Sequence, residues 1–193
     1  VESILGDLRD EKGNWQFRLE DHPEIGYVRI TKFGNKTAEE LSRVLAGLHA
    51  ENVQGLILDL RDNYGGSLDA AVEVCDLFLP AGRTIVVTRG RSETVLERFR
   101  SSGNGPYLET PLAVLVNQNS ASASEIVAAC LQDYQRAAVV GQRTYGKGTV
   151  QRLLRTESGR SQLKLTTATY WRPSGKNIHR FPGASDEDEC GVL

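Results

Sequence analysis

Short stretches of the sequence carry residue types that could take part in breaking a covalent bond. The first is NQNSASASE, Asn117 to Glu125, in which three serines alternate with alanines ahead of an apolar run. A serine where a strand turns into a helix stands clear of the sheet, and the free N–H groups of the first helical turn can stabilise an oxyanion. Serine is also a preferred N-cap residue, so its position alone favours a capping role.

A nucleophilic serine needs a base to accept its proton. The histidines, His22, His49 and His179, do not lie at strand ends that are expected to converge with the serines. Lys147, between two glycines in TYGKGTVQ, is the other candidate. A lysine serves as a base only when it is neutral, so its pKa would have to fall from ~10.4 toward ~7–8, which burial can achieve. A lone lysine in a turn is more often a surface residue.

The second stretch is DLRDNYGGSLD, in which Gly65 and Gly66 follow an apolar run. Such a turn can present backbone N–H groups to an anion, although paired glycines mostly just make turns. The carboxylates of Asp59, Asp62 and Asp69 lack the spacing of a known metal site.

The elements that must position these residues follow from hydrophobic patterning. Strands are expected at 25–33, 55–60 and 112–117, with helices at 37–52, 68–79 and about 122–135 between and after them. The run at 55–60 is typical of a strand covered on both faces. Thr37 and Glu40 match a capping box for the first helix. Val127, Cys130 and Leu131 make one apolar face of the last helix, together with Tyr134.

This order predicts an α/β fold built from right-handed βαβ units. Loops 61–67, 117–122 and 141–148 should then meet at the carboxyl ends of the strands, where ligands bind in such sheets. The stretches at 83–90, 93–100, 149–155 and 161–171 are expected to add antiparallel strands.

Composition limits the classes of function. The 193 residues suit one domain, and a net charge of -2 gives no basic field for nucleic acid. No run reaches transmembrane length, and no signal peptide opens the chain, although a removed targeting segment is compatible with this start. Three widely spaced cysteines make neither a disulfide framework nor a metal set. We expect Cys75 and Cys130 in the core, and a free thiol at Cys190 in an acidic tail.

Three motifs, taken together and in this order, resemble those of the carboxyl-terminal processing (tail-specific) proteases. LILDLRDNYGG is followed by VLVNQNSASASE and then by GKGTVQ, and the resemblance covers roughly Ile25 to Ile178. It implies a serine protease with a Ser–Lys dyad in an α/β fold akin to the crotonase and Clp protease superfamily. In this family Ser122 would be the nucleophile, Lys147 the general base and Gln151 the residue that orients the lysine amine.

The resemblance also implies the rest of the site. The oxyanion would be held by the backbone N–H of Ala123 and by that of Gly65 or Gly66. No metal or cofactor is required. Three more residues match family positions that support the site, and capping or structural roles are the nearer expectation for them: Glu125, Asp133 and Thr144.

The domain organisation is expected to be an N-terminal linker strand region at 1–24, a protease core at 25–180 and an acidic tail at 181–193. The PDZ domain that family members usually carry is not visible. The resemblance implies protein or peptide substrates with accessible C-terminal regions, and a location in the periplasm, in the cell envelope or outside the cell. The oligomeric state stays open.

Two other functions fit the same fold. One is a catalytically inactive module that binds lipids or retinoids, and the other is a crotonase-like acyl-CoA enzyme without a nucleophile. The presence of Ser122, Lys147 and Gln151 together argues against the inactive module.

Overall fold

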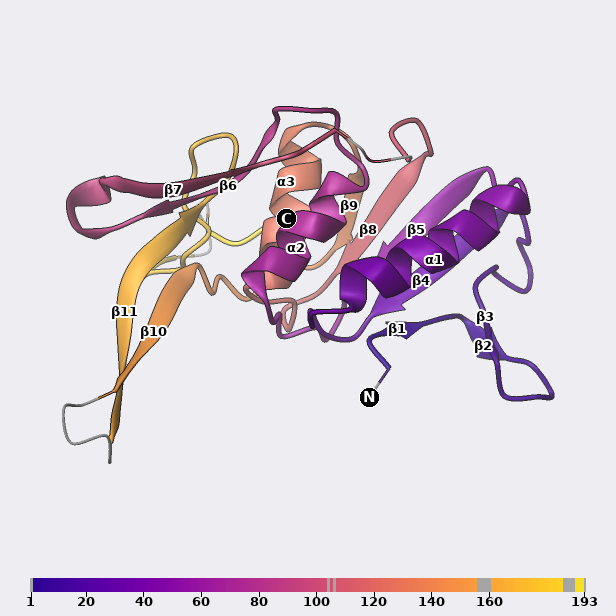
Figure 1. Cartoon of the computed structure of the whole chain (residues 1–193), viewed down its shortest axis with the longest axis horizontal. Coiled ribbons are helices and arrows are strands. Elements are labelled where there is room, and N and C mark those ends of the chain that lie inside the picture. The colour runs from indigo at the N-terminus through magenta and orange to yellow at the C-terminus, as the bar shows by residue number, and fades with distance from the viewer. Residues whose placement is uncertain (1, 104, 106, 156–160, 186–189, 193) are drawn as a thin grey trace.

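A computed structural model describes residues 2–103, 105, 107–155, 161–185 and 190–192 (Figure 1). The acidic residues 186–189 of the expected tail lie outside this part of the chain.

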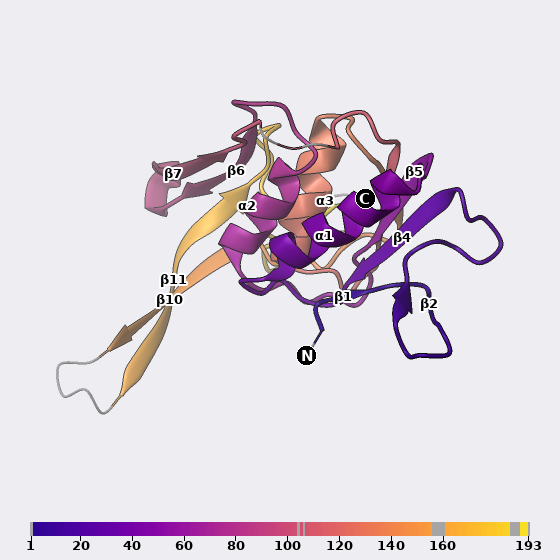
Figure 2. The ribbon, with the colours of Figure 1, turned by 45° about the vertical axis from the view of Figure 1, so that its right-hand side comes forward.

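The centre of the molecule is a five-stranded sheet in the order β1-β4-β5-β8-β9. All neighbours pair in parallel except β1, which runs antiparallel to β4. Successive parallel strands lie side by side and are joined by right-handed crossovers, so the three helices pack on one face of the sheet (Figures 1 and 2). The predicted α/β core is thereby confirmed. Its elements are β1 (Ile4–Leu5), β4 (Ile25–Ile30), α1 (Thr37–Ala50), β5 (Gly55–Asp59), α2 (Leu68–Asp76), β8 (Leu112–Val116), α3 (Ala123–Asp133) and β9 (Ala138–Gly141).

Helix α1 forms as predicted, but its capping box is wrong. The N-cap is Lys36, and its side chain makes no capping hydrogen bond. The Thr37 hydroxyl instead accepts the N–H of Gly34 at 2.9 Å. Glu40 accepts the hydroxyl of Ser3, which lies just before the edge strand β1, and therefore ties the helix to that strand rather than to its own first turn.

Two expectations about burial need correction. Strand β5 is covered by helices on one face only, and Ile57, which points to the other face, is half-buried. Helix α3 buries its predicted apolar face and its other faces as well: every residue from Ala123 to Leu131 is buried. The reason is that α3 contacts α2, β6 and β9, so it has neighbours on several sides (Figure 1).

A second, antiparallel sheet has the order β10-β11-β6-β7. Its β10–β11 hairpin projects away from the body of the molecule (Figure 2). The expected antiparallel strands are thus confirmed. This part of the fold consists of β6 (Thr84–Arg89), a short 3-10 helix η1 (Arg91–Glu93), β7 (Val95–Arg100), β10 (Thr149–Arg155) and β11 (Gln162–Trp171), while β2 (Leu8–Arg9) and β3 (Trp15–Gln16) pair separately near the N-terminus. Among the described helices, none has the length and apolar character needed to cross a membrane.

The described end of the expected acidic tail is packed into the molecule. Val192 is 1% exposed, and its N–H donates to the Thr144 hydroxyl at 2.8 Å. Cys190 is buried rather than presented in a solvated tail, and Cys75 and Cys130 lie in the core as expected. All three thiols are free.

Candidate active site

Asn63, in the loop after β5, connects three parts of the fold. Its side chain is fully buried, donates to the Ile30 carbonyl at 2.8 Å and accepts the N–H of Gly65 at 2.9 Å. Its own carbonyl accepts the N–H of Ala121 at 3.0 Å and the hydroxyl of Ser124 at 2.8 Å. Asn63 therefore holds the glycine pair against the start of α3. Sequence reasoning missed this role, because an asparagine before two glycines reads as an ordinary turn residue.

Asp59 ends β5 and fixes the start of the same loop. Its buried carboxylate accepts the Arg61 guanidinium at 2.7 Å and the Tyr27 hydroxyl at 2.6 Å. Burial acts to raise the pKa of Asp59, but the hydrogen bonds from Arg61 and Tyr27 outweigh it and hold the pKa below its usual value. Burial and the neighbouring carboxylate raise the pKa of Tyr27 to about 12. The Asp59 carboxylate is therefore occupied by hydrogen bonds that hold the start of the loop.

Gly65 approaches the central serine of the SASAS segment closely. Its φ is +98°, and a Cβ added there would lie 2.9 Å from Ser122 Cβ and 3.0 Å from the Ala123 nitrogen. Only glycine allows this approach, because any side chain would collide with the start of α3. The loop and the serine segment therefore meet at the carboxyl ends of β5 and β8, as the βαβ pattern predicts.

Gly66 directs its backbone N–H away from Phe33. The Phe33 N–H donates to the Gly65 carbonyl at 3.1 Å, and the Phe33 carbonyl accepts the Ser67 N–H at 2.8 Å. In this parallel bridge, Gly65 and Ser67 make both hydrogen bonds to Phe33. The N–H of Gly66, which lies between them, therefore points away from Phe33. The Gly66 N–H has no hydrogen-bond partner within the described residues, whereas that of Gly65 is held by Asn63.

The three serines are not equivalent. Ser120 and Ser124 are fully buried, and their hydroxyls donate to the carbonyls of Leu60 and Asn63 at 2.8 Å each. Ser122 alone of the three is partly exposed. Its φ of 58° and ψ of -112° lie outside the regions that non-glycine residues ordinarily occupy. Such strain is found where function requires a side chain in a fixed orientation.

The Glu125 carboxylate joins the serine to the glycine–lysine turn. It accepts the backbone N–H groups of Ser122 and Lys147 on the same oxygen, each at 2.8 Å. Its other oxygen accepts the Gly146 N–H and the Thr144 hydroxyl, each at 2.6 Å. Burial raises the pKa of Glu125, against the opposing effect of these four hydrogen bonds. One fully buried side chain therefore sets the spacing between the backbones of Ser122 and Lys147.

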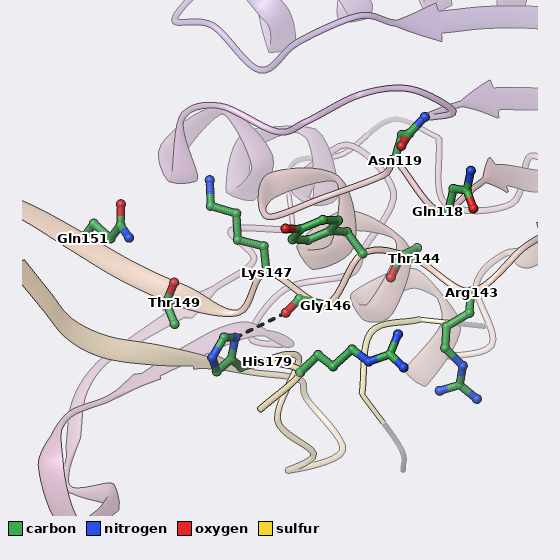
Figure 3. Close-up of a pocket in the computed structure, with 11 residues that line it drawn as sticks. Gln118, Asn119, Arg143, Thr144, Gly146, Lys147, Thr149, Gln151 and His179 are labelled. Atoms are coloured by element: carbon green, nitrogen blue, oxygen red, sulfur yellow. Dashed lines mark hydrogen bonds between the residues drawn. The ribbon is translucent and has the colours of Figure 1, made fainter. Parts of the chain in front are cut away.

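The Lys147 side chain points into an open cavity of about 970 Å³ (Figure 3). Lys147 is exposed, and within the described part of the chain its ammonium makes no hydrogen bond to Ser122 or to Gln151. The structure thus brings the two backbones together without closing a Ser–Lys pair. The cavity is lined by Gln118, Asn119, Arg143, Thr144, Tyr145, Gly146, Lys147, Thr149, Gln151, His179 and Arg180.

Gln151 and His179 share this cavity with Lys147 (Figure 3). Gln151 lies on β10 just after an irregularity in the pairing with β11, and it is exposed. His179 lies within hydrogen-bond distance of the Gly146 carbonyl, 3.2 Å from Nδ1, so Nδ1 is the donor. The Arg180 N–H donates to the same carbonyl at 2.9 Å. The local sequence pattern does not predict the position of His179 at this turn, because it depends on the contact of Ile178 with Tyr170 on β11.

Asp133 lies at the other end of α3 from Ser122. Its carboxylate pairs with the Arg172 guanidinium at 2.5 Å and accepts the Ser174 N–H at 2.9 Å. It therefore ties α3 to the end of β11 and does not contact the reactive residues. Within the described residues no cluster of His, Cys, Asp or Glu side chains could hold a metal ion.

This geometry suits acyl transfer. A partly exposed serine lies at the start of a helix, Gly65 approaches it closely, and a lysine lines a cavity on the turn that Glu125 joins to it.

Comparisons with known proteins point the same way. The model of peptidase family S41 matches residues 24–186. A carboxy-terminal-processing protease of Bartonella bacilliformis is 42% identical over 168 residues, which cover 84% of this chain and 38% of that protein. A carboxyl-terminal-processing protease of Synechocystis sp. is 41% identical over 163 residues, or 84% of this chain and 37% of that protein.

Among solved structures, a photosystem II D1 C-terminal processing protease superposes with a TM-score of 0.76 at 35% identity, over 80% of this chain and 39% of that one. A putative S41 protease from Bacteroides fragilis, at 23% identity and a TM-score of 0.66, shares the fold. The chain spans less than half the length of each of these relatives.

Proposed function

Because the chain belongs to peptidase family S41, we propose that it forms the catalytic core of a serine endopeptidase that cleaves protein substrates near their C-termini. The observation that carries this proposal is the shared Glu125 carboxylate. It holds the backbone of the strained, accessible Ser122 and the backbone of Lys147 at 2.8 Å from one oxygen. No other pair of a serine and a base is placed in this way among the described residues.

In the proposed reaction, neutral Lys147 takes the proton of Ser122 and the Ser122 oxygen attacks the scissile carbonyl. The N–H groups of Ala123 and Gly66 stabilise the oxyanion. We prefer Gly66 to Gly65 because the Gly65 N–H already donates to Asn63. The protonated lysine then gives its proton to the leaving amine, and water hydrolyses the acyl-enzyme with Lys147 again acting as the base.

Lys147 must turn from the open cavity toward Ser122 for this reaction. We propose that a bound substrate strand drives this step, because it would fill the cavity and remove water from around the amine. Gln151, on the wall of the same cavity, would then orient the amine by a hydrogen bond. The proposed location is the periplasm, the cell envelope or the exterior of the cell.

The test is digestion of an unstructured protein by the wild-type chain, by three site variants and by one control variant, with product termini read by mass spectrometry. Ser122→Ala and Lys147→Ala should each abolish cleavage. Lys147→Arg should do the same, because arginine stays charged and cannot act as a base. Lys12→Ala, which removes an exposed lysine near the N-terminus, is the matched control. Wild-type rates in the Ser122 or Lys147 variants would disprove the mechanism.

A serine-directed acylating probe separates this proposal from its rivals. The protease should be labelled on Ser122, and labelling should depend on Lys147. A module that only binds lipids, or an acyl-CoA enzyme without a nucleophile, would leave Ser122 unlabelled.

A further inference from the structure

The outer part of the β10–β11 hairpin presents apolar side chains to solvent. The hairpin projects from the body of the molecule (Figures 1 and 2). Its leucines are each between 40% and 64% exposed: Leu153, Leu154, Leu163 and Leu165. Neighbouring apolar side chains that stay exposed mark a surface that contacts another molecule.

The pairing register places an arginine and a leucine on each face of β10. Neighbouring residues of a strand point to opposite faces, so Arg152 and Leu154 share one face of β10. Leu153 and Arg155 share the other face. All four are exposed, and Leu163 on β11 lies opposite Leu154 and extends the apolar surface. A strand that lay beside β10 would therefore meet one cation and one apolar side chain on either face.

Strand β10 also has an open backbone edge. It is the last strand of its sheet, and within the described residues it pairs only with β11. The outward N–H and C=O groups of such an edge strand can pair with a strand of another chain. The same groups disfavour insertion of the hairpin into a lipid bilayer, because unpaired backbone groups are costly in hydrocarbon. The edge therefore suits an extended protein segment.

The hairpin is positively charged. Between Thr149 and Trp171 the sequence holds one acid, Glu157, and four basic residues, so the hairpin has a net charge of +3 while the whole chain has -2. The basic residues are Arg152, Arg155, Arg160 and Lys164. None of the ion pairs among the described residues involves a cation of the hairpin. A second copy of β10 would bring like charges together along the edge, whereas an acidic segment would pair with them.

Strand β10 begins beside the candidate active site. It starts at Thr149, two residues after Lys147, and Gln151 lines the same cavity as Lys147 (Figure 3). Arg152 follows Lys147 by five residues, and an extended chain rises about 3.3 Å per residue. A substrate that leaves the cavity along β10 would therefore reach Arg152 within about five residues of the scissile bond.

We propose that the edge of β10 is a second binding site for protein substrates, and that it takes an extended segment with the order acid, apolar, apolar, acid. Side chains that lie opposite each other on neighbouring strands share a face and interact. The two acids of the segment would pair with Arg152 and Arg155, and its apolar residues would pack on Leu153 and Leu154. Because these residue types read the same from both ends of β10, the segment can run in either direction. This inference rests on the proposed function and adds a substrate feature to it.

Binding is measured on the full Ser122→Ala chain, which cannot cleave its ligand. Three fluorescent peptides share the same flanks and differ in their central residues, which are Glu-Leu-Leu-Glu, Gln-Leu-Leu-Gln or Lys-Leu-Leu-Lys. In fluorescence anisotropy the Glu form should bind roughly two- to thirtyfold more tightly than the Gln form, the range for two exposed ion pairs, and the Lys form should bind most weakly. Added salt should reduce the difference. Equal affinities for the three peptides would overturn the proposal.

Variants of β10 assign the preference to its residues. Arg152→Gln combined with Arg155→Gln should abolish the difference between the Glu and Gln peptides. Leu153→Thr combined with Leu154→Thr should weaken the binding of all three peptides. Arg98→Gln, which changes an exposed arginine on the edge strand β7, is the matched control and should retain the preference. An unchanged preference in the double arginine variant would contradict the assignment.

Cleavage shows whether the partner is a substrate. A cleavage site found by the digestion experiment is joined to the Glu or the Gln segment, placed about five residues before or after the scissile bond. In one of these two positions the wild-type chain should cleave the Glu form with a kcat/KM roughly two- to thirtyfold higher, mainly through a lower KM. Selective binding together with equal cleavage in both positions would show that the partner is not a substrate.

These results distinguish failure of the binding site from failure of the protease. Selective binding to the Ser122→Ala chain without any cleavage by wild type would support the acidic-segment site and contradict the protease. Cleavage by wild type with no preference in either assay would do the reverse. Sedimentation velocity and flotation with phosphatidylglycerol vesicles test the other occupants. Self-association or vesicle binding that the double leucine variant abolishes, without peptide selectivity, would assign the edge to a second copy or to a lipid surface instead.

Discussion

Replacing Asn63 by alanine should destabilise the protein and impair the site together. The substitution removes the partners of two backbone groups, the Ile30 carbonyl and the Gly65 N–H, which are bound at 2.8 and 2.9 Å. Asn63 is fully buried, so water does not replace either bond. An unsatisfied buried group costs about 1–3 kcal/mol, so we expect the free energy of unfolding to fall by roughly 2–6 kcal/mol.

The assay is urea denaturation of wild type, Asn63→Ala and the surface control Asn14→Ala. The slope of unfolding free energy against denaturant should stay constant while the midpoint falls for Asn63→Ala. The control removes an exposed bond to Asp10 and should stay within about 0.5 kcal/mol of wild type. A loss below about 0.5 kcal/mol for Asn63→Ala would refute the reasoning. At a temperature where the variant is still folded, labelling of Ser122 by an acylating probe should also slow, because the glycine pair is no longer held against α3.

Three further predictions follow from the same contacts. Gly66→Ala should lower the yield of folded protein or its thermal midpoint, because the new Cβ would lie 2.0 Å from the Phe33 carbonyl oxygen. Asp133→Ala should cost about 3–5 kcal/mol in a denaturation assay, since it leaves the Arg172 guanidinium, 11% exposed, without its ion pair; an unchanged midpoint would contradict this. Because the pKa of Asp59 is lowered in the folded protein, its stabilisation is present above an unfolded pKa of about 3.9 and is lost as the pH falls below that value. Asp59→Asn should therefore flatten the dependence of stability on pH between about pH 5 and pH 2, as measured by denaturation at several pH values.

Much of the fold could be predicted because local patterns and topology agree. Continuous apolar runs, turn residues and helical periodicity located the strands and helices of the βαβ core, whereas the placement of all three helices on one face of the sheet (Figure 1) was not predicted. The predictions that failed were those that depend on contacts between residues outside the local pattern. The Thr37 capping box matched a sequence pattern, but Gly34 competes for the same hydroxyl in the folded chain.

In the site, too, the residues of local motifs could be predicted and those placed by long-range contacts could not. The resemblance of the sequence motifs singled out Ser122 among the three serines. The structure supplies a physical distinction, because Ser120 and Ser124 are fully buried and bonded to carbonyls. Asn63 and His179 were missed because their roles come from bonds to Ile30 and Gly146, which lie 33 residues away in each case. The spacing of residues within a motif does not predict contacts between residues this far apart in the sequence.

The bonds around Glu125 also bear on how the protein is made. Completion of the serine site requires Ile30, far before Ser122 in the sequence, and Val192, far after it. Ile30 binds Asn63, and Val192 supports Thr144, which in turn bonds to Glu125. Contacts of such long sequence separation form slowly, and only after both partners have been synthesised. A ribosome-bound chain that has emerged only as far as Ser122 therefore carries the serine without its site. The contacts that hold Ser122 in place are therefore complete only after residue 192 has been synthesised.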